Sequence, residues 1–189
     1  MTGIVVAPAQ YEPPGHGAEA LLPVFAAEIL HVGPQGLGVL RAAPAAGAVL
    51  MSLVLAHRPP MQKAGRTMLV AVAIFASCII VFGISRSFWL SLFVLAVSGM
   101  ADTISVVIRS TLIQVFTPTE IYGRVTAVNS IFIGSSNELG AFESGVMARL
   151  LGTVPSVVVG GFASLGVVGF VTARVPQLRR LGRIESSTT

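Results

Sequence analysis

Apolar residues gather in long runs along the chain, and short polar turns separate one run from the next. Most runs are close to or above the roughly 20 residues that an α-helix needs to cross a bilayer. One run, residues 18–30, is interrupted by Pro23 and is too short to cross a bilayer. The pattern predicts an all-α fold, an integral membrane helix bundle over residues 18–176. We expect the full spans at about residues 36–56, 67–84, 88–116, 125–147 and 155–173.

The two ends of the chain differ in character from the bundle. Residues 1–17 are rich in Pro and Gly and lack the basic start and apolar run of a signal peptide. We expect them to be a disordered segment unrelated to the bundle. We expect residues 18–30 to be the second half of a spanning helix whose first half is absent, with a short interfacial helix as the alternative. Residues 177–189 form a basic tail.

Composition points to the same class. The chain is 53% hydrophobic and only 11% charged, with a mean hydropathy of +0.84, whereas soluble domains carry about 25% charged residues. The net charge of +4 does not indicate nucleic acid, because most of the basic residues lie in the turns and the tail. The basic residues are concentrated in the turn after 36–56, in the turn after 88–116 and near the C-terminus. By the positive-inside rule, we expect these parts on the cytoplasmic side of the inner (plasma) membrane.

A polar seam crosses the apolar span 88–116. Ser98, Asp102, Ser105 and Arg109 follow one another at steps of four, three and four residues, which places them on one face of a helix. The rest of this helix is apolar, so the seam cannot be the wet side of a surface helix. We expect it to face protein or a water-filled cavity.

The span 125–147 carries acids of its own. Asn137, Glu138 and Glu143 lie inside it, beside a stripe of small residues, Ser136, Gly140 and Ser144, of the kind that lets membrane helices approach closely. Spans 67–84 and 155–173 hold no charge, and we expect them to face lipid while the charged spans turn inward.

Two roles are open for the intramembrane charges. Asp102 or Glu138 could bind and release a proton during transport, because an apolar environment favours the neutral form of a carboxylate. Alternatively, Asp102, Arg109, Asn137 and Glu138 form a fixed network that joins the two spans. Arg41, early in span 36–56, either extends to the interface or meets an anionic substrate.

The run from Met100 to Gly145, which begins MADTISVVIRSTLIQVF, resembles the tenth and eleventh helices of the major facilitator superfamily, and within it the enterobactin exporter-like branch. Residues 20–50 resemble the end of the seventh helix and the eighth. The resemblance implies the C-terminal six-helix half of a twelve-helix transporter with its first helix truncated. It also places the charge-free spans on the outside, as the ninth and twelfth helices.

The resemblance further implies gating loops on the cytoplasmic side. The chain departs from the family pattern at two points: His57 stands where an Asp is expected, and Tyr122 stands where a basic residue is usual. Both changes weaken the charge pairing that is expected to hold the helix ends together. The loop residues concerned are Arg58, Gly65, Arg66, Glu120, Gly123 and Arg124.

These observations favour secondary transport, the export of a siderophore or a drug-like small molecule coupled to protons, by one half of a transporter. A non-transporting fragment or assembly partner is the first alternative, and a permease subunit of an ATP-driven transporter is the second. Expected partners are the lipid bilayer, the substrate, and the missing N-terminal half or a second copy of the chain, but not nucleic acid. Without a phosphate-binding Gly loop, HExxH, GxSxG or paired Cys, we expect no enzyme, cofactor or metal.

Overall fold

A computed structural model describes residues 21–57 and 64–174, and it is built from helices throughout this part of the chain. The expectations for residues 1–17, Arg58 and the tail 177–189 lie outside the described residues. The helices are α3 (Leu22–Glu28), α4 (Pro34–Ala56), α5 (Ala64–Ile84), α6 (Phe88–Phe116), α7 (Tyr122–Leu151) and α8 (Thr153–Arg174). An all-α bundle is therefore the fold.

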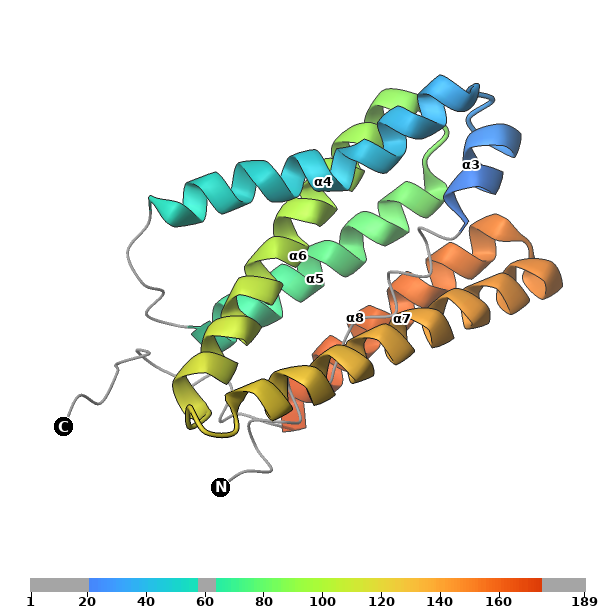
Figure 1. Ribbon diagram of the computed structural model, residues 1–189. Coiled ribbons are helices and arrows are strands. Elements are labelled where there is room, and N and C mark those ends of the chain that lie inside the picture. Colours follow the sequence, from blue (N-terminus) through green and yellow to red (C-terminus); the bar gives the residue numbers. More distant parts are fainter. Residues whose placement is uncertain (1–20, 58–63, 175–189) are drawn as a thin grey trace.

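The five long helices pack as a series, α4 on α6, α6 on α5, α5 on α8 and α8 on α7 (Figure 1). Consecutive helices run in alternating directions. The start of α5, the turn 117–121 and the end of α8 lie at one end of the bundle, and the turns 29–33 and 85–87 lie at the other (Figure 1).

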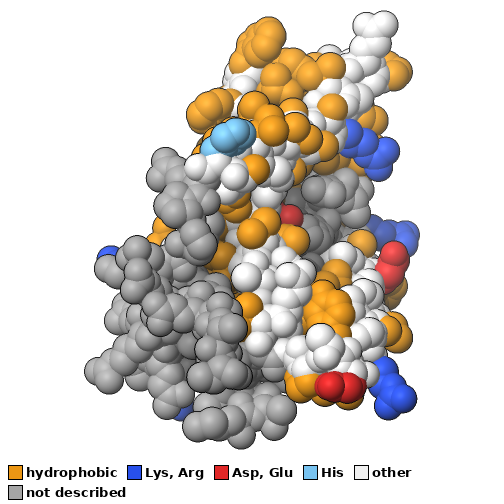
Figure 2. All heavy atoms as spheres, turned by 60° about the vertical axis from the view of Figure 1, so that its left-hand side comes forward, with side chains coloured by type: hydrophobic (Ala, Val, Ile, Leu, Met, Phe, Trp, Pro, Cys, Tyr) orange, Lys and Arg blue, Asp and Glu red, His pale blue; other side chains and the backbone are white. Residues whose placement is uncertain are grey.

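Four of the described helices are long and apolar enough to cross a membrane: α4, α5, α6 and α8. Helix α7 has 30 residues, which at about 1.5 Å per residue is also long enough. It is less apolar, because it carries Asn137, Glu138 and Glu143. Figure 2 shows hydrophobic side chains exposed across the described surface of one face, as expected for a bundle surrounded by lipid.

Helix α5, one of the two spans expected to face lipid, is partly enclosed by its neighbours and keeps one exposed apolar side. Helix α5, which holds no charge between 67 and 84, packs on both α6 and α8 and contributes many buried residues. It is the middle helix of the series and has only one exposed side, which includes Val70 and Ile74. Absence of charge predicted contact with lipid, but it equally suits a helix that is enclosed by apolar neighbours.

Close helix approach depends on two glycines that the sequence did not single out. A Cβ added at Gly47 in α4 would overlap the carbonyl oxygen of Ala96 in α6, and one at Gly99 in α6 would overlap that of Pro44 in α4. The backbones of α4 and α6 therefore touch where these residues lie. At Gly140, in the small-residue stripe of α7, a Cβ would meet no described atom within 4 Å, so the stripe does not provide close packing there.

Helix α3 is short, but it is firmly packed. Phe25 is fully buried, and its ring lies 4.5 Å from that of Phe82 at the end of α5, centroid to centroid. Leu22, one turn before Phe25, and the adjacent Ala26 are buried in the same cluster as Phe82 and Val157 of α8. This cluster fixes α3 against the end of the bundle where the turn 85–87 lies.

We expect Phe25→Ala to release α3 from the bundle, because truncating a buried Phe costs about 3–5 kcal/mol. Hydrogen exchange of the amides in residues 22–28 should accelerate while exchange in α5 stays slow. Val24→Ala is the control, since Val24 is exposed on the same helix. Equal exchange rates in the two variants would contradict the packing role of Phe25.

Candidate transport site

The polar seam of α6 is largely enclosed by the bundle. Ser98 and Ser105 are buried, and Arg109 is 9% exposed, whereas Asp102 is half-buried. The Ser98 hydroxyl donates to the carbonyl oxygen of Leu95 at 2.7 Å. Asp102 and Arg109 each take part in a polar or electrostatic interaction within the chain. The seam thus places two ionisable side chains within an apolar helix and away from its exposed side.

Helix α7, unlike the seam of α6, is not enclosed by the bundle. None of its described residues is buried, and it packs mainly on α8. Glu138 and Glu143 are exposed, and Asn137 is half-buried. The Ser156 hydroxyl of α8 donates to the carbonyl oxygen of Ser144 at 3.2 Å, which is a polar contact between these two helices. The described part of the chain therefore leaves both acids of α7 uncovered.

The fixed network proposed for Asp102, Arg109, Asn137 and Glu138 would require α6 and α7 to lie together. In the series of packed helices, α5 and α8 stand between them. Glu138 is exposed, whereas Arg109 is buried. The structure accordingly does not join these four residues into one cluster, and the α6 seam and the α7 acids are two separate polar regions.

Arg41 lies in the second turn of α4, and its side chain is exposed. It is about 10 Å along the helix from Pro34, at 1.5 Å per residue. A long Arg side chain can place its charge at the membrane interface from this depth. The structure therefore leaves Arg41 outside both polar regions of α6 and α7.

The loop residues lie together at one end of the bundle. Gly65 is buried at the start of α5, and Arg66 beside it is exposed. Glu120, Gly123 and Arg124 are exposed around the turn that leads into α7. Across residues 21–57 and 64–174, no group of three or more His, Cys, Asp or Glu side chains could hold a metal ion.

Sequence reasoning missed a buried serine pair at the other end. The Ser91 hydroxyl in α6 donates to the Ser85 oxygen at 3.0 Å, and the Ser85 hydroxyl donates to the carbonyl oxygen of Ser87 at 3.2 Å. Three serines within the stretch ISRSFWLS are the available signal. The pair connects the turn 85–87 to the first turn of α6.

Comparison with known proteins agrees with this architecture. Over 150 residues the chain is 27% identical to the enterobactin exporter EntS of Citrobacter koseri, and the match covers 79% of this chain and 36% of that protein. The chain thus spans well under half of the length of this relative. No solved structure matches the chain significantly. Residues 14–188 match the family described as transmembrane secretion effector, so the chain belongs to this family of major facilitator superfamily transporters.

Proposed function

We propose that this chain forms one side of a membrane passage that exports a small molecule, with a siderophore of the enterobactin class as the first substrate to test. The family is one of membrane transporters, and the curated relative is described as an enterobactin exporter. Membership of the major facilitator superfamily favours secondary transport over an ATP-driven permease. We further propose that the protein lies in the inner membrane with the basic turns in the cytoplasm.

The observation that carries this proposal is the open face of α7. Glu138 and Glu143 are exposed on a helix with no buried residue, at positions that lie within the apolar thickness of the bundle. A carboxylate in contact with acyl chains is costly, so such residues face a water-filled cavity or a partner. A passage shared with a second polypeptide provides both, and that polypeptide is an N-terminal transporter half or a second copy of this chain.

The α6 seam supplies the candidate coupling group. Asp102 is half-buried, and Arg109 lies two turns along the same helix, roughly 10 Å away at 1.5 Å per residue. A half-buried carboxylate near a positive charge can bind a proton when water reaches it, and it can release the proton when its environment again favours the charged form. We propose Asp102 as the proton-binding group and Arg109 as the positive charge that stabilises its ionised form.

The test is enterobactin accumulation in inside-out vesicles from cells that express the full chain. We expect uptake driven by an imposed pH gradient to exceed that of vesicles without the chain. Asp102→Asn should lower the driven component severalfold because the amide cannot exchange a proton. Ser98→Ala, on the same face, is the control and should preserve uptake, provided both variants reach the membrane in equal amounts.

Two results would count against the proposal. Uptake no greater than in vesicles without the chain, with or without an added N-terminal half from a relative, would favour a non-transporting assembly partner. Full gradient-driven uptake by Asp102→Asn would remove the coupling role from this residue while leaving export intact.

A further inference from the structure

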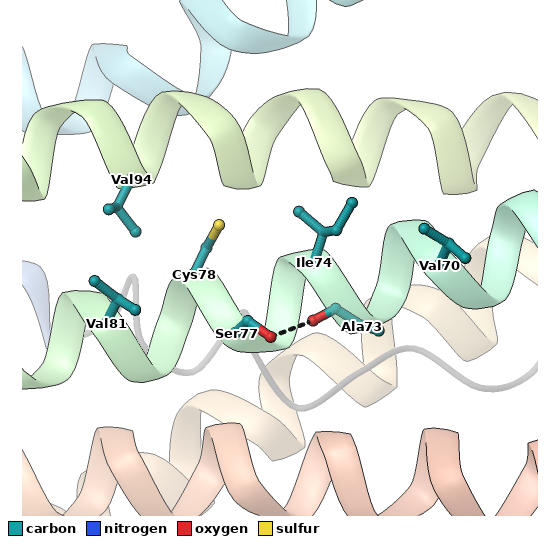
Figure 3. A pocket seen from close by; sticks show the side chains of 7 residues that line it. All are labelled: Val70, Ala73, Ile74, Ser77, Cys78, Val81 and Val94. Carbon is teal, nitrogen blue, oxygen red and sulfur yellow. Dashed lines mark hydrogen bonds between the residues drawn. The ribbon is translucent and has the colours of Figure 1, made fainter.

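A shallow apolar groove follows one side of α5 where it lies against α6 (Figure 3). Its volume is about 340 Å³, and it is lined by one face of α5 between Val70 and Val81, with Val94 of α6 opposite. Val70, Ile74 and Val81 are between 42% and 51% exposed. The groove therefore opens sideways toward the space that lipid occupies around the bundle.

The groove offers almost nothing to a polar ligand. Its hydroxyl group, that of Ser77, donates to the carbonyl oxygen of Ala73 at 2.8 Å within α5 (Figure 3). The remaining lining side chains are aliphatic, apart from the half-buried thiol of Cys78. A hydrocarbon chain is the ligand that loses least on entering such a surface.

The length of the groove matches one leaflet. From Val70 to Val81 the helix rises eleven residues, which at 1.5 Å per residue is about 16 Å. The hydrocarbon core of a bilayer is about 30 Å thick, so the groove extends over roughly half of it. The groove crosses the middle of the candidate span Gly65–Ile84, so an acyl chain that enters beside Arg66 fills the part from Val70 to about Ser77. A spanning helix of a partner would need a groove about twice as long.

A positive charge stands at one end of the same face. Arg66 lies one turn before Val70 and two turns before Ile74, so the three residues share one side of α5. Arg66 is exposed, and it is the second residue of the candidate span Gly65–Ile84, so a headgroup would lie beside it if this span crosses a bilayer. A guanidinium binds a phosphate through two parallel hydrogen bonds. Arg86 lies beyond the opposite end of α5, in the turn 85–87.

We propose that the groove between α5 and α6 is a binding site for an anionic phospholipid, with an acyl chain along the groove from Val70 toward Ser77 and the phosphate on Arg66. The proposal needs the membrane location of the chain but not its export activity. Attraction to an anionic headgroup contributes about 1 kcal/mol per basic residue near the surface, which corresponds to severalfold enrichment over a zwitterionic lipid.

The experiment uses the purified full chain in vesicles that contain a trace of phospholipid with a photoactivatable diazirine in its acyl chain. Labelled phosphatidylglycerol and labelled phosphatidylcholine are compared, and the adducts are located by mass spectrometry. We expect severalfold more phosphatidylglycerol than phosphatidylcholine on residues 70–81. Arg66→Gln should bring the two lipids to equal labelling, whereas the matched variant Arg86→Gln should preserve the difference.

A second variant tests the groove itself. Ile74→Phe enlarges a side chain that lines the groove and should reduce labelling of residues 70–81 by either lipid. The exposed face of α8 around Phe162 lies outside this groove and should label equally with both lipids in every variant. Equal labelling of 70–81 in the unmodified chain, or the same loss for Arg66→Gln and Arg86→Gln, overturns the proposal. An absence of adducts on 70–81 would do so too, since a partner helix or a substrate would then cover the groove.

Discussion

Gly47→Ala is expected to disrupt the packing of α4 on α6. The new Cβ would overlap the carbonyl oxygen of Ala96, and a backbone atom cannot rotate away as a side chain can. Inserting an atom into a well-packed contact typically costs about 1–3 kcal/mol, and a clash with backbone lies at the upper end of that range. For a chain of this length, such a loss lowers the midpoint of thermal unfolding by roughly 5–10 °C.

The measurement is thermal unfolding in detergent, followed by the far-UV signal of the helices. Gly38→Ala is the matched control, because Gly38 is on the same helix and a Cβ there would meet no described atom within 4 Å. It should leave the midpoint unchanged or raise it slightly, since Ala favours the helix over Gly. Gly99→Ala should behave as Gly47→Ala does. If Gly47→Ala and Gly38→Ala unfold at the same temperature, the contact between α4 and α6 is not as close as the structure has it.

The positions of the helices could be predicted from the sequence, because the length and apolar character of each run determine them directly. The span expected at residues 88–116 coincides with α6, Phe88–Phe116, and the run 36–56 falls within α4, Pro34–Ala56. Around 125–147 the helix α7 extends further at both ends, to Tyr122 and Leu151. The turns here are short and polar, and the helix continues until Gly152, whose φ of 93° ends it.

Which helices touch was harder to predict than where the helices lie. Gly47 and Gly99 carry the closest approach in the described part of the chain, but each is an isolated glycine in an Ala- and Ser-rich helix. The stripe with Gly140 had the familiar four-residue spacing and yet faces open space at that glycine. Spacing within one helix shows which residues share a face, but not which neighbour that face meets.

The candidate site illustrates the same limit. The spacing of the four seam residues, Ser98, Asp102, Ser105 and Arg109, correctly predicted that they share one face of α6. Three of the four are buried. Their relation to Glu138 could not be read from the sequence, because it depends on the order in which the helices pack. In the series of packed helices α5 and α8 stand between α6 and α7, so the described part of the chain keeps the acids of α7 apart from the seam of α6.

The central claim is that the acids of α7 face water in a shared passage, and cysteine accessibility tests it. Cys78 is the single cysteine of the chain, so Cys78→Ala provides a background without thiols. Glu138→Cys is then compared with Phe162→Cys, because Phe162 is exposed near the middle of α8. Only a thiolate reacts, and it forms in water rather than in hydrocarbon.

The measurement is the rate at which a charged, membrane-impermeant thiosulfonate modifies each variant in native membranes. We expect Glu138→Cys to react at least about tenfold faster than Phe162→Cys, since a shift of 1.4 kcal/mol in the free energy of the thiolate changes its population tenfold. Equal and slow modification of both variants would place Glu138 against acyl chains and contradict the passage.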